Sequence, residues 1–481
     1  MKFINHKITI ALTGILISTM VLSSCKKEFL EVTPSTSIPN SEAFDSPAKL
    51  TAAMTGLYDL VSFSGYTNNI LLNMDVKGED VQVNSTNNYS RFIAGYQYIE
   101  TVNSSELSVH WAYSYKIIAN CNQLIENVPA APIDDDVKTQ YTAEARALRA
   151  LAHFNLVREF GGKPYTVDPS ALGVPVMEKS ILATDVPPAR ATVAEVYTSI
   201  ISDLTYAEAN FPESINDVYR INKGTIQGLL ARVYLTMGDY TNASKFAKLA
   251  SAGYTLSSAN DLLAGFSDPT SEWMWALNTR SDDNNGFLQT QSFYDPYGDG
   301  YSSFTVTEEF LNSFADNDLR KNQFRIPSVR GNDVKTGDYE FYGDGWLTSK
   351  FIFRGAWDND QLMMRASEMV LIEAESEARL GNTAAAKAAL LLIQQRAIPT
   401  AVISANTGDA LVAEILVERR KELFGEGHRY YDILRTKQTL DRSASVSSWS
   451  KLVIASGDKR FALPIPQAEI DANPNMVQNP L

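Results

Sequence analysis

The chain has 481 residues, of which 44% are hydrophobic and 20% are charged, and its formal net charge is -14 at neutral pH. A chain of this length and hydrophobic content can bury a large apolar core, arranged in one or two closely joined domains. The acidic balance, with no basic run above the background, argues against a nucleic-acid partner and against a patch that binds anionic lipid.

The first 24 residues have the regions of a bacterial signal peptide. Lys2 and Lys7 provide a positive start, and residues 8–22 follow without a formal charge. A helix of this length reaches about 22 Å, which is short of the roughly 30 Å hydrocarbon core of a membrane. The segment therefore predicts export and cleavage, not a permanent membrane span.

Two serines then lead to Cys25 in a small-residue run that resembles the bacterial lipobox. Cleavage there would leave Cys25 as an acylated first residue, and its acyl chains would hold the protein on a membrane. The alternative is a soluble secreted protein whose cysteine is accidental. The other cysteine, Cys121, has no partner for an intramolecular disulfide once Cys25 is acylated. Residues 25–40, marked by Pro34 and Pro39, are predicted to form a tether.

Helices are predicted over most of the remaining chain, because apolar residues recur at helical spacing. The predicted helices are 105–128, 142–160, 192–210, 223–237, 240–252 and 361–380. The helix over 142–160 is predicted to bury one face. Small residues recur at matching intervals in 238–250 and 381–393, the spacing of tetratricopeptide units, where they let two helices approach closely. About four helix pairs are expected.

Residues 256–360 differ in composition, since Gly, Asn, Asp, Ser and aromatic residues are frequent and no helical period is sustained. The stretch is predicted to contain long loops and short strands. An irregular stretch of this length inside a compact protein is typical of a functional insertion. Ligand contacts are therefore expected here.

Four stretches carry a resemblance to a known family. They are AEARALRALAHFNLVREFGGKPY (143–165), LLARVYLTMGDYTNASKFA (229–247), RASEMVLIEAESEARLG (365–381) and the tail from 418, with its motifs ERRKELFGEGHRYYDILR (418–435) and FALPIPQAEIDANPNMVQNP (461–480). The two tail motifs are the most specific. Together these stretches resemble the SusD/RagB-like family of outer-membrane nutrient-binding lipoproteins.

The resemblance implies a mainly α fold, a tetratricopeptide-like α/α superhelix of about four helix pairs with a large loop-rich insertion that contains short strands. In a body of residues 41–481, helical repeats would occupy about 41–255 and 361–435, the ligand-binding region about 256–360, and a closing segment 436–481. The resemblance also implies a SusC-like TonB-dependent transporter as the partner, and a lipid-anchored position on the outer membrane that faces the extracellular side.

No ligand motif can be carried over from the family, so the candidate ligand contacts come from residue chemistry. Aromatic rings stack on the apolar faces of sugar rings, and nearby polar groups satisfy the hydroxyls. The candidates are Tyr66, Asn68, Tyr89, Arg91, Tyr96, Tyr294, Tyr297, Tyr301 and Trp346, from a wider group that includes Phe293 and Trp357. Tyr294 and Trp346 are the first choices. The alternative, favoured for any single ring, is that these aromatics pin loops to the helical body.

The charged tail motif favours a structural ion network over an active site. Its members are Glu418, Arg419, Glu422, Glu426, His428, Arg429 and Asp432. Arg429 and Asp432 are spaced to pair with each other. Two acidic, glycine-containing groups at 282–286 and 295–300 resemble calcium loops without the full ligand spacing, so turn formation explains them and no cofactor is expected. A structural calcium ion in these oxygen-rich loops is the alternative.

No signature of a hydrolase, a zinc enzyme or a nucleotide-binding loop occurs, and the protein is predicted not to be an enzyme. The predicted function is binding of oligosaccharide nutrients for delivery to the transporter. An oligopeptide ligand is the alternative within the same class. A surface glycoside hydrolase stays open because acidic residues such as Asp75, Glu79 and Asp80 fall in predicted loops. A scaffold lipoprotein without a small ligand is the third class.

Overall fold

The computed structural model describes residues 44–182, 184–213, 215–329 and 336–480. The predicted signal peptide (1–24), Cys25 and the tether (25–40) lie outside these residues. Within them, no helix combines the length and the apolar character that a membrane crossing requires.

The described residues form nine long helices, several short helical elements and ten short strands. The long helices are α2 (Pro47–Ser62), α6 (Ser105–Asn127), α7 (Asp135–Phe160), α8 (Val193–Asn210), α9 (Lys223–Met237), α10 (Tyr240–Ser251), α14 (Ala366–Arg379), α15 (Thr383–Ala397) and α16 (Gly408–Glu422). The short helical elements are α3 (Ser64–Asn68), η2 (Asn69–Asn73), α4 (Met74–Val76), α5 (Ile93–Gln97), η3 (Val128–Ala130), α11 (Ala259–Leu262), η4 (Gly286–Leu288), α12 (Thr290–Tyr294), α13 (Glu308–Asn312), η5 (Leu319–Phe324), α17 (Arg429–Arg435), η7 (Lys459–Phe461) and α18 (Gln467–Ala472). The strands are β1 (Val81–Val83), β2 (Trp273–Leu277), β3 (Phe304–Val306), β4 (Arg325–Ile326), β5 (Asp338–Tyr339), β6 (Phe341–Tyr342), β7 (Gly345–Trp346), β8 (Gln361–Arg365), β9 (Leu440–Asp441) and β10 (Val453–Ile454).

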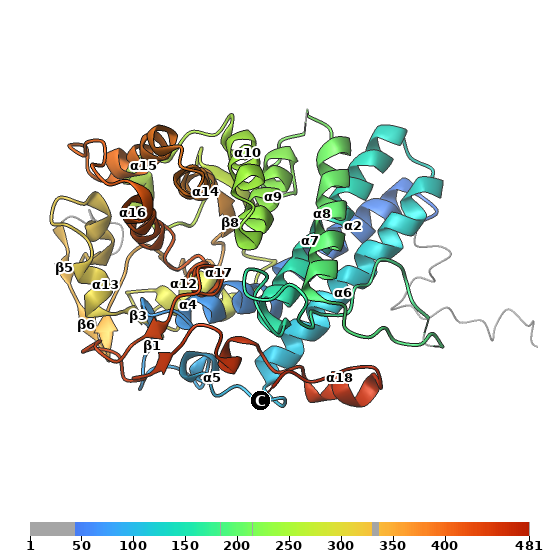
Figure 1. The fold of residues 1–481 in the computed structure, drawn as a ribbon, viewed down its shortest axis with the longest axis horizontal. Helices are drawn as coiled ribbons and strands as arrows, with labels where there is room; N and C mark the ends of the chain where they lie inside the picture. The colour runs from blue at the N-terminus through green and yellow to red at the C-terminus, as the bar shows by residue number, and fades with distance from the viewer. Residues whose placement is uncertain (1–43, 183, 214, 330–335, 481) are drawn as a thin grey trace, which may run out of the picture.

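The long helices pack on their neighbours in the chain and build one continuous array. In Figure 1 the array runs from α2 and α6 on the right, through α9 and α10, to α14, α15 and α16 at the upper left. Helix α10 packs on both α9 and α14, so the helices before and after the insertion join directly. This arrangement confirms the predicted mainly α, tetratricopeptide-like fold.

Small side chains allow the close approach of α10 to its neighbours. Ala243, Ala247 and Ala250 are fully buried on one face of α10. Gly238 ends α9 in the left-handed conformation, with φ of 80°, and its N–H donates to the carbonyl of Leu235. A glycine adopts this conformation without the steric cost that a Cβ adds, so the chain can turn sharply from α9 into α10.

Helix α7 differs from the prediction of a helix with one buried face. It starts at Asp135, earlier than predicted, and nearly all of its residues from Tyr141 onward are buried. The reason is its position, because α7 packs against both α6 and α8. A helix that is covered on several sides has no solvent face to maintain.

The prediction of a single helix over 361–380 is wrong at its start. Residues Gln361–Arg365 form strand β8, which pairs antiparallel with β2, and α14 begins at Ala366. The β2 strand, Trp273–Leu277, is buried along its whole length. A short buried apolar run is compatible with helix or strand, and a partner distant in the sequence decided the outcome.

A second apolar core lies where the insertion packs on residues 72–96, and short strands from both segments contribute to it. Strands β1, β3, β7 and β6 form one antiparallel sheet, at the lower left of Figure 1. Under it lie phenylalanine rings in edge-to-face contact, such as Phe92 with Phe293 at 5.3 Å between ring centroids. Many aromatic residues of this region therefore stabilise it internally.

A buried ion network joins the insertion to the helical array. At the end of β8, the Arg365 guanidinium lies 2.6 Å from Glu272, 2.5 Å from Glu422 and 2.7 Å from Glu426. Burial alone would raise the pKa of Glu422, but its arginine neighbours hold that pKa well below the ordinary value. The charges are thus compensated where water cannot solvate them.

The predicted pairing of Arg429 with Asp432 is wrong. Arg429 pairs with Glu79, which precedes β1, and Asp432 pairs with Arg419 and Arg435. Both residues lie on α17, which packs on α4. Arg429 therefore pairs with a residue from outside α17, and Asp432 pairs with Arg419 of α16 and with Arg435, one turn later on α17.

Two histidines with lowered pKa values, His153 and the partly exposed His428, predict a loss of stability in mild acid. Burial lowers the pKa of His428 to about 4 and that of His153 to about 3. Both side chains are therefore neutral in the folded protein at pH 5 and above. In the unfolded chain their pKa returns to about 6.5, so they take up protons below that pH. The contribution of each histidine to the free energy of unfolding is therefore complete above pH 6.5. Below pH 6.5 it decreases by about 1.4 kcal/mol for each unit by which the pH is lowered.

The free energy of unfolding should therefore decrease between pH 6.5 and 5, as measured by urea unfolding. His153→Gln keeps an acceptor for the Met177 N–H, which donates to the histidine ring at 3.3 Å. This variant should show a shallower pH dependence. An unchanged slope would contradict the assignment of a neutral His153.

Candidate functional site

Four aromatic side chains form a row of accessible rings on the insertion and the loop before α5. We call Tyr89, Tyr301, Phe287 and Trp357 the aromatic row. The ring centroids lie 4.8 Å apart for Tyr89 and Tyr301, 5.8 Å for Tyr301 and Phe287, and 5.5 Å for Phe287 and Trp357. Tyr89, Phe287 and Trp357 are 57%, 44% and 38% exposed. Adjoining exposed rings are rare on soluble proteins unless they bind something.

The backbone that carries the row is held in unusual conformations. Tyr89 and Trp357 have φ of 51° and 57°, in the left-handed region that residues with a Cβ seldom adopt. Side-chain amides fix both segments: Asn87 donates to the carbonyl of Tyr301 at 3.1 Å, and Gln289 donates to the carbonyl of Trp357 at 2.5 Å. Strained backbone of this kind persists where the surroundings impose it, and it clusters at functional sites.

Arg91 adds a cation to the row. Its guanidinium carbon lies 5.4 Å from the centroid of the Tyr301 ring, and both side chains are half-buried. The group can donate several hydrogen bonds in one plane beside the rings. Flat apolar faces next to a polar donor suit a ligand that has both C–H faces and hydroxyl groups.

Three predicted contacts do not lie on an accessible surface. Tyr66, Tyr96 and Tyr294 were expected in loops, but they lie in α3, α5 and α12 and are at most 1% exposed. Their hydroxyl groups have internal partners: Tyr66 accepts from Asn155, and Tyr294 donates to Asp75. The prediction for these three is therefore wrong in this structure, because their rings belong to the apolar cores.

Asn68 is also buried, and its amide donates to the carbonyl of Leu288 at 3.0 Å. It lines a polar cavity that adjoins the row. Tyr297 is half-buried in the turn 295–300, next to the row in sequence. Its role as a ligand contact stays a prediction.

Trp346 lies on the β6–β7 hairpin beside the loop that carries Tyr89. The ring is half-buried and meets Phe341, which is 54% exposed, edge to face at 5.3 Å. Asn84, at the base of the loop, donates to the carbonyl of Tyr342 in the hairpin at 3.3 Å. A ligand contact by Trp346 also stays a prediction.

Sequence reasoning named Tyr89, Arg91 and Tyr301, and the structure brings these three together. It missed Phe287, and it placed Trp357 only in the wider group. Phe287 follows the Asn-Asn-Gly sequence at 284–286, a turn signal that marks an exposed tip. That signal was available in the sequence and would have indicated exposure.

Asp75, Glu79 and Asp80, the acidic residues that left a glycoside hydrolase as an alternative function, make internal contacts. Burial raises the pKa of Asp75, which accepts from Tyr294 and from the Gly427 N–H. Glu79 and Asp80 pair with arginines of the tail motif. Their carboxylates therefore stabilise the fold through contacts with the tail motif and with Tyr294.

The groups that resemble calcium loops form turns. Asp295 accepts from the backbone N–H groups of Asp299 and Gly300, and Asp282 pairs with Arg280. Among the residues that the structure describes, no cluster of three or more His, Cys, Asp or Glu side chains is arranged to hold a metal ion.

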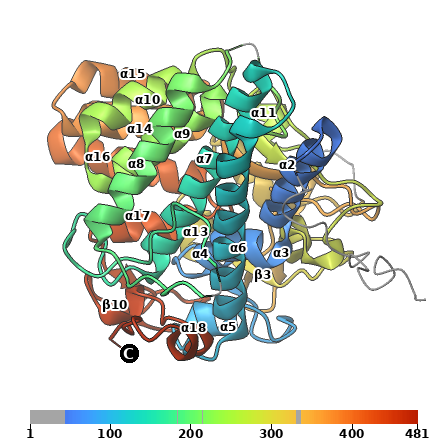
Figure 2. The same ribbon diagram turned by 90° about the vertical axis from the view of Figure 1, so that its right-hand side faces the viewer.

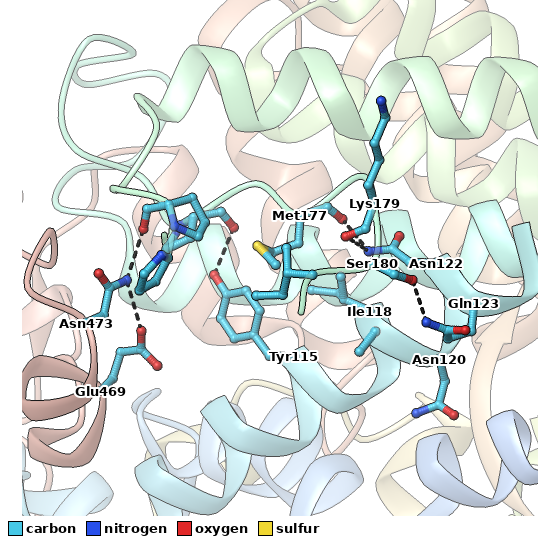
Figure 3. Close-up of a pocket in the computed structure, with 15 residues that line it drawn as sticks. Tyr115, Ile118, Asn120, Asn122, Gln123, Met177, Lys179, Ser180, Glu469 and Asn473 are labelled. Atoms are coloured by element: carbon cyan, nitrogen blue, oxygen red, sulfur yellow. Dashed lines mark hydrogen bonds between the residues drawn. The ribbon is translucent and has the colours of Figure 1, made fainter. Parts of the chain in front are cut away.

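A cavity of about 350 Å³ lies on a different face, between α6, the segment 175–188 and α18 (Figure 3). Its polar groups are largely used to hold that segment. Tyr115 donates to the carbonyl of Pro175, and Asn122 donates to those of Met177 and Lys179. In Figure 2, α18 lies at the foot of α6. This cavity offers mainly apolar lining and suits a hydroxylated ligand less well than the aromatic row does.

Two family models match the chain. Residues 28–235 match a family described as starch-binding and associating with the outer membrane, and residues 345–481 match the SusD family. The two matched ranges cover helices on both sides of the insertion and the closing segment.

Complete proteins also resemble the chain over nearly its full length. The SusD-like protein P38 of Formosa agariphila is 25% identical over an alignment that covers 99% of each chain. A SusD superfamily protein from Bacteroides thetaiotaomicron has a TM-score of 0.80 and 28% identity, covering 91% of this chain and 100% of that one. A putative sugar-binding protein from Bacteroides vulgatus has a TM-score of 0.80 and 29% identity, covering 91% and 99%.

Proposed function

This chain belongs to the SusD/RagB-like family, and on that premise we propose that it binds oligosaccharide nutrients at the cell surface through the aromatic row. The observation that carries the proposal is the run of accessible rings from Tyr89 to Trp357 beside Arg91. Ring spacings near 5 Å allow an extended ligand to contact several rings at once. A relative described as sugar-binding supports the same class of ligand.

The protein would hold the nutrient without breaking a bond and would pass it to a SusC-like TonB-dependent transporter. Acylation of Cys25 would keep it on the outer membrane, facing outward. The helical array would meet the transporter, and the insertion would face the ligand. An oligopeptide ligand is the alternative within this proposal, because peptides also bind to aromatic surfaces. A glycosidase is disfavoured by the internal pairing of Glu79 and Asp80.

Removal of two rings should weaken saccharide binding. Tyr301→Ala and Trp357→Ala should each lower the affinity by about threefold to tenfold, because one stacking contact is worth about 0.5–1.5 kcal/mol. Isothermal titration calorimetry would use maltoheptaose, laminarihexaose and an oligopeptide library. If the two contacts add, the double variant should lose a further threefold to tenfold in affinity relative to either single variant.

Tyr206→Ala is the matched control, since Tyr206 on α8 also has an arginine over its ring, with the guanidinium carbon of Arg146 at 4.1 Å. It should bind as the unaltered protein does. Saccharide affinity that survives loss of both rings of the row would refute the proposed site. Release of smaller sugars during long incubation would refute the assignment as a binding protein.

A further inference from the structure

A second cavity, of about 210 Å³, adjoins the aromatic row and has an unusual lining. It is enclosed by the end of α2, by α3 and α6, and by residues from 277–291 and 359–361. Eight of its twenty lining residues are asparagine or glutamine. Its three charged lining residues, Asp59, Lys116 and Asp283, are exposed. We call it the amide cavity.

The amide cavity shares a wall with the row. Phe287 of the row lies on η4, whose neighbours Asn285, Leu288 and Gln289 line the cavity. Gln289 lines the amide cavity, and its side-chain amide donates to the carbonyl of Trp357 in the row, so this hydrogen bond connects the two sites. A chain of sugars that lies on Phe287 and Trp357 can therefore continue into the cavity.

The wall is held rigidly before any ligand arrives. Asn285 accepts from the N–H of Ser64 at 3.1 Å and donates to the carbonyl of Ser62 at 2.8 Å. These bonds fasten the segment to the junction of α2 and α3. A preformed site does not spend binding free energy on ordering its own side chains.

Three successive buried residues on this wall keep polar oxygens without partners among the described residues. They are Oε1 of Gln289, Oγ1 of Thr290 and Oε1 of Gln291, in residues that are 6%, 2% and 1% exposed. Buried polar atoms in native proteins are almost always paired, so three unused acceptors in succession are unusual for one short segment. All three residues line the amide cavity.

The remaining lining favours a neutral hydroxylated ligand. A carboxamide offers one acceptor and two donors without charge, which matches a hydroxyl group that both donates and accepts. Phe63 and Tyr113, stacked at 4.2 Å between ring centroids, supply an apolar surface on the same cavity. We infer that the amide cavity is a further saccharide subsite, which receives the end of an oligosaccharide lying on the aromatic row. This inference rests on the proposed function.

The test compares short and long oligosaccharides. Asn278 and Gln361 line the cavity and lie outside the row, so the variant carrying both Asn278→Ala and Gln361→Ala leaves the row intact. Calorimetry would use maltooligosaccharides and laminarioligosaccharides of two to seven units. We expect affinity to rise with length in the unaltered protein. The double variant should lose about tenfold for the longest sugars and little for the disaccharides.

Asn120→Ala is the matched control, because Asn120 is an exposed amide of α6 that lines the other cavity, the one between α6 and α18. This variant should have the same saccharide affinity as the unaltered protein at every length. A double variant with the same length dependence as the unaltered protein would overturn the subsite and leave the proposed function standing. Equal losses for short and long sugars would also overturn it, and so would a loss for oligopeptides in place of sugars. If the unaltered protein binds no saccharide, both the function and the subsite fail.

Discussion

Replacement of Arg365 by methionine should lower the free energy of unfolding by more than about 3 kcal/mol. Arg365 is 1% exposed and contacts three buried carboxylates, those of Glu272, Glu422 and Glu426. Methionine fills much of the same space but leaves these carboxylates with less compensating charge. The uncompensated charges, not the lost contacts alone, account for the size of the effect.

Guanidinium chloride unfolding would measure this change. Arg280→Met is the control, since Arg280 pairs with Asp282 on the surface, where their side chains are 64% and 68% exposed. Water solvates both groups there, so little change in stability is expected. Equal effects of the two substitutions would mean that the buried network does not stabilise the junction between the insertion and the helical array.

Replacement of Gly427 by alanine should cost about 3 kcal/mol or more of stability. Gly427 has φ of +78°, and a Cβ there would lie 2.5 Å from the carbonyl oxygen of Ile70 and 2.9 Å from the Cα of Leu71. Its N–H also donates to buried Asp75 at 3.0 Å. The substitution therefore adds left-handed strain, about 1–2 kcal/mol, to a collision with backbone that cannot move cheaply.

Gly457→Ala separates these two contributions. Gly457 has nearly the same φ, +79°, but a Cβ there would meet nothing within 4 Å. The Gly457→Ala variant should therefore lose only the stability that corresponds to left-handed strain, about 1–2 kcal/mol. Thermal and denaturant unfolding of both variants would give the comparison. If Gly427→Ala is no worse than Gly457→Ala, the close approach of the tail motif to η2 is not a constraint on the fold.

Much of the helical body could be predicted from local pattern. Helix α9 has the predicted bounds, and α6, α8 and α10 agree with their predictions to within one residue at each end. Capping residues explain this precision: Thr192 and Glu195 form a capping box at the start of α8, and Gly238 ends α9. Periodicity and caps act within a few residues, so one sequence contains the information.

The candidate site was only partly predictable. Composition indicated accessible aromatic residues, and Tyr89, Arg91 and Tyr301 do lie together, although their contact with a ligand stays a prediction. The same reasoning placed Tyr294 beside Trp346 as a first choice, although Tyr294 is fully buried against Asp75 and Phe304. A tyrosine in an irregular stretch has the same local signature whether its ring fills a core or faces water.

Local sequence thus specified four of the long helices and their ends, α6, α8, α9 and α10, and the quoted motifs specified the family. Packing between distant segments decided the rest: that residues Gln361–Arg365 pair with β2 as a strand, that α7 is covered on both sides, and which aromatic rings stay accessible. The physical reason is that burial is a property of what covers a side chain. The segments that cover Tyr294 or expose Phe287 are brought there by folding, from parts of the chain that no local pattern connects.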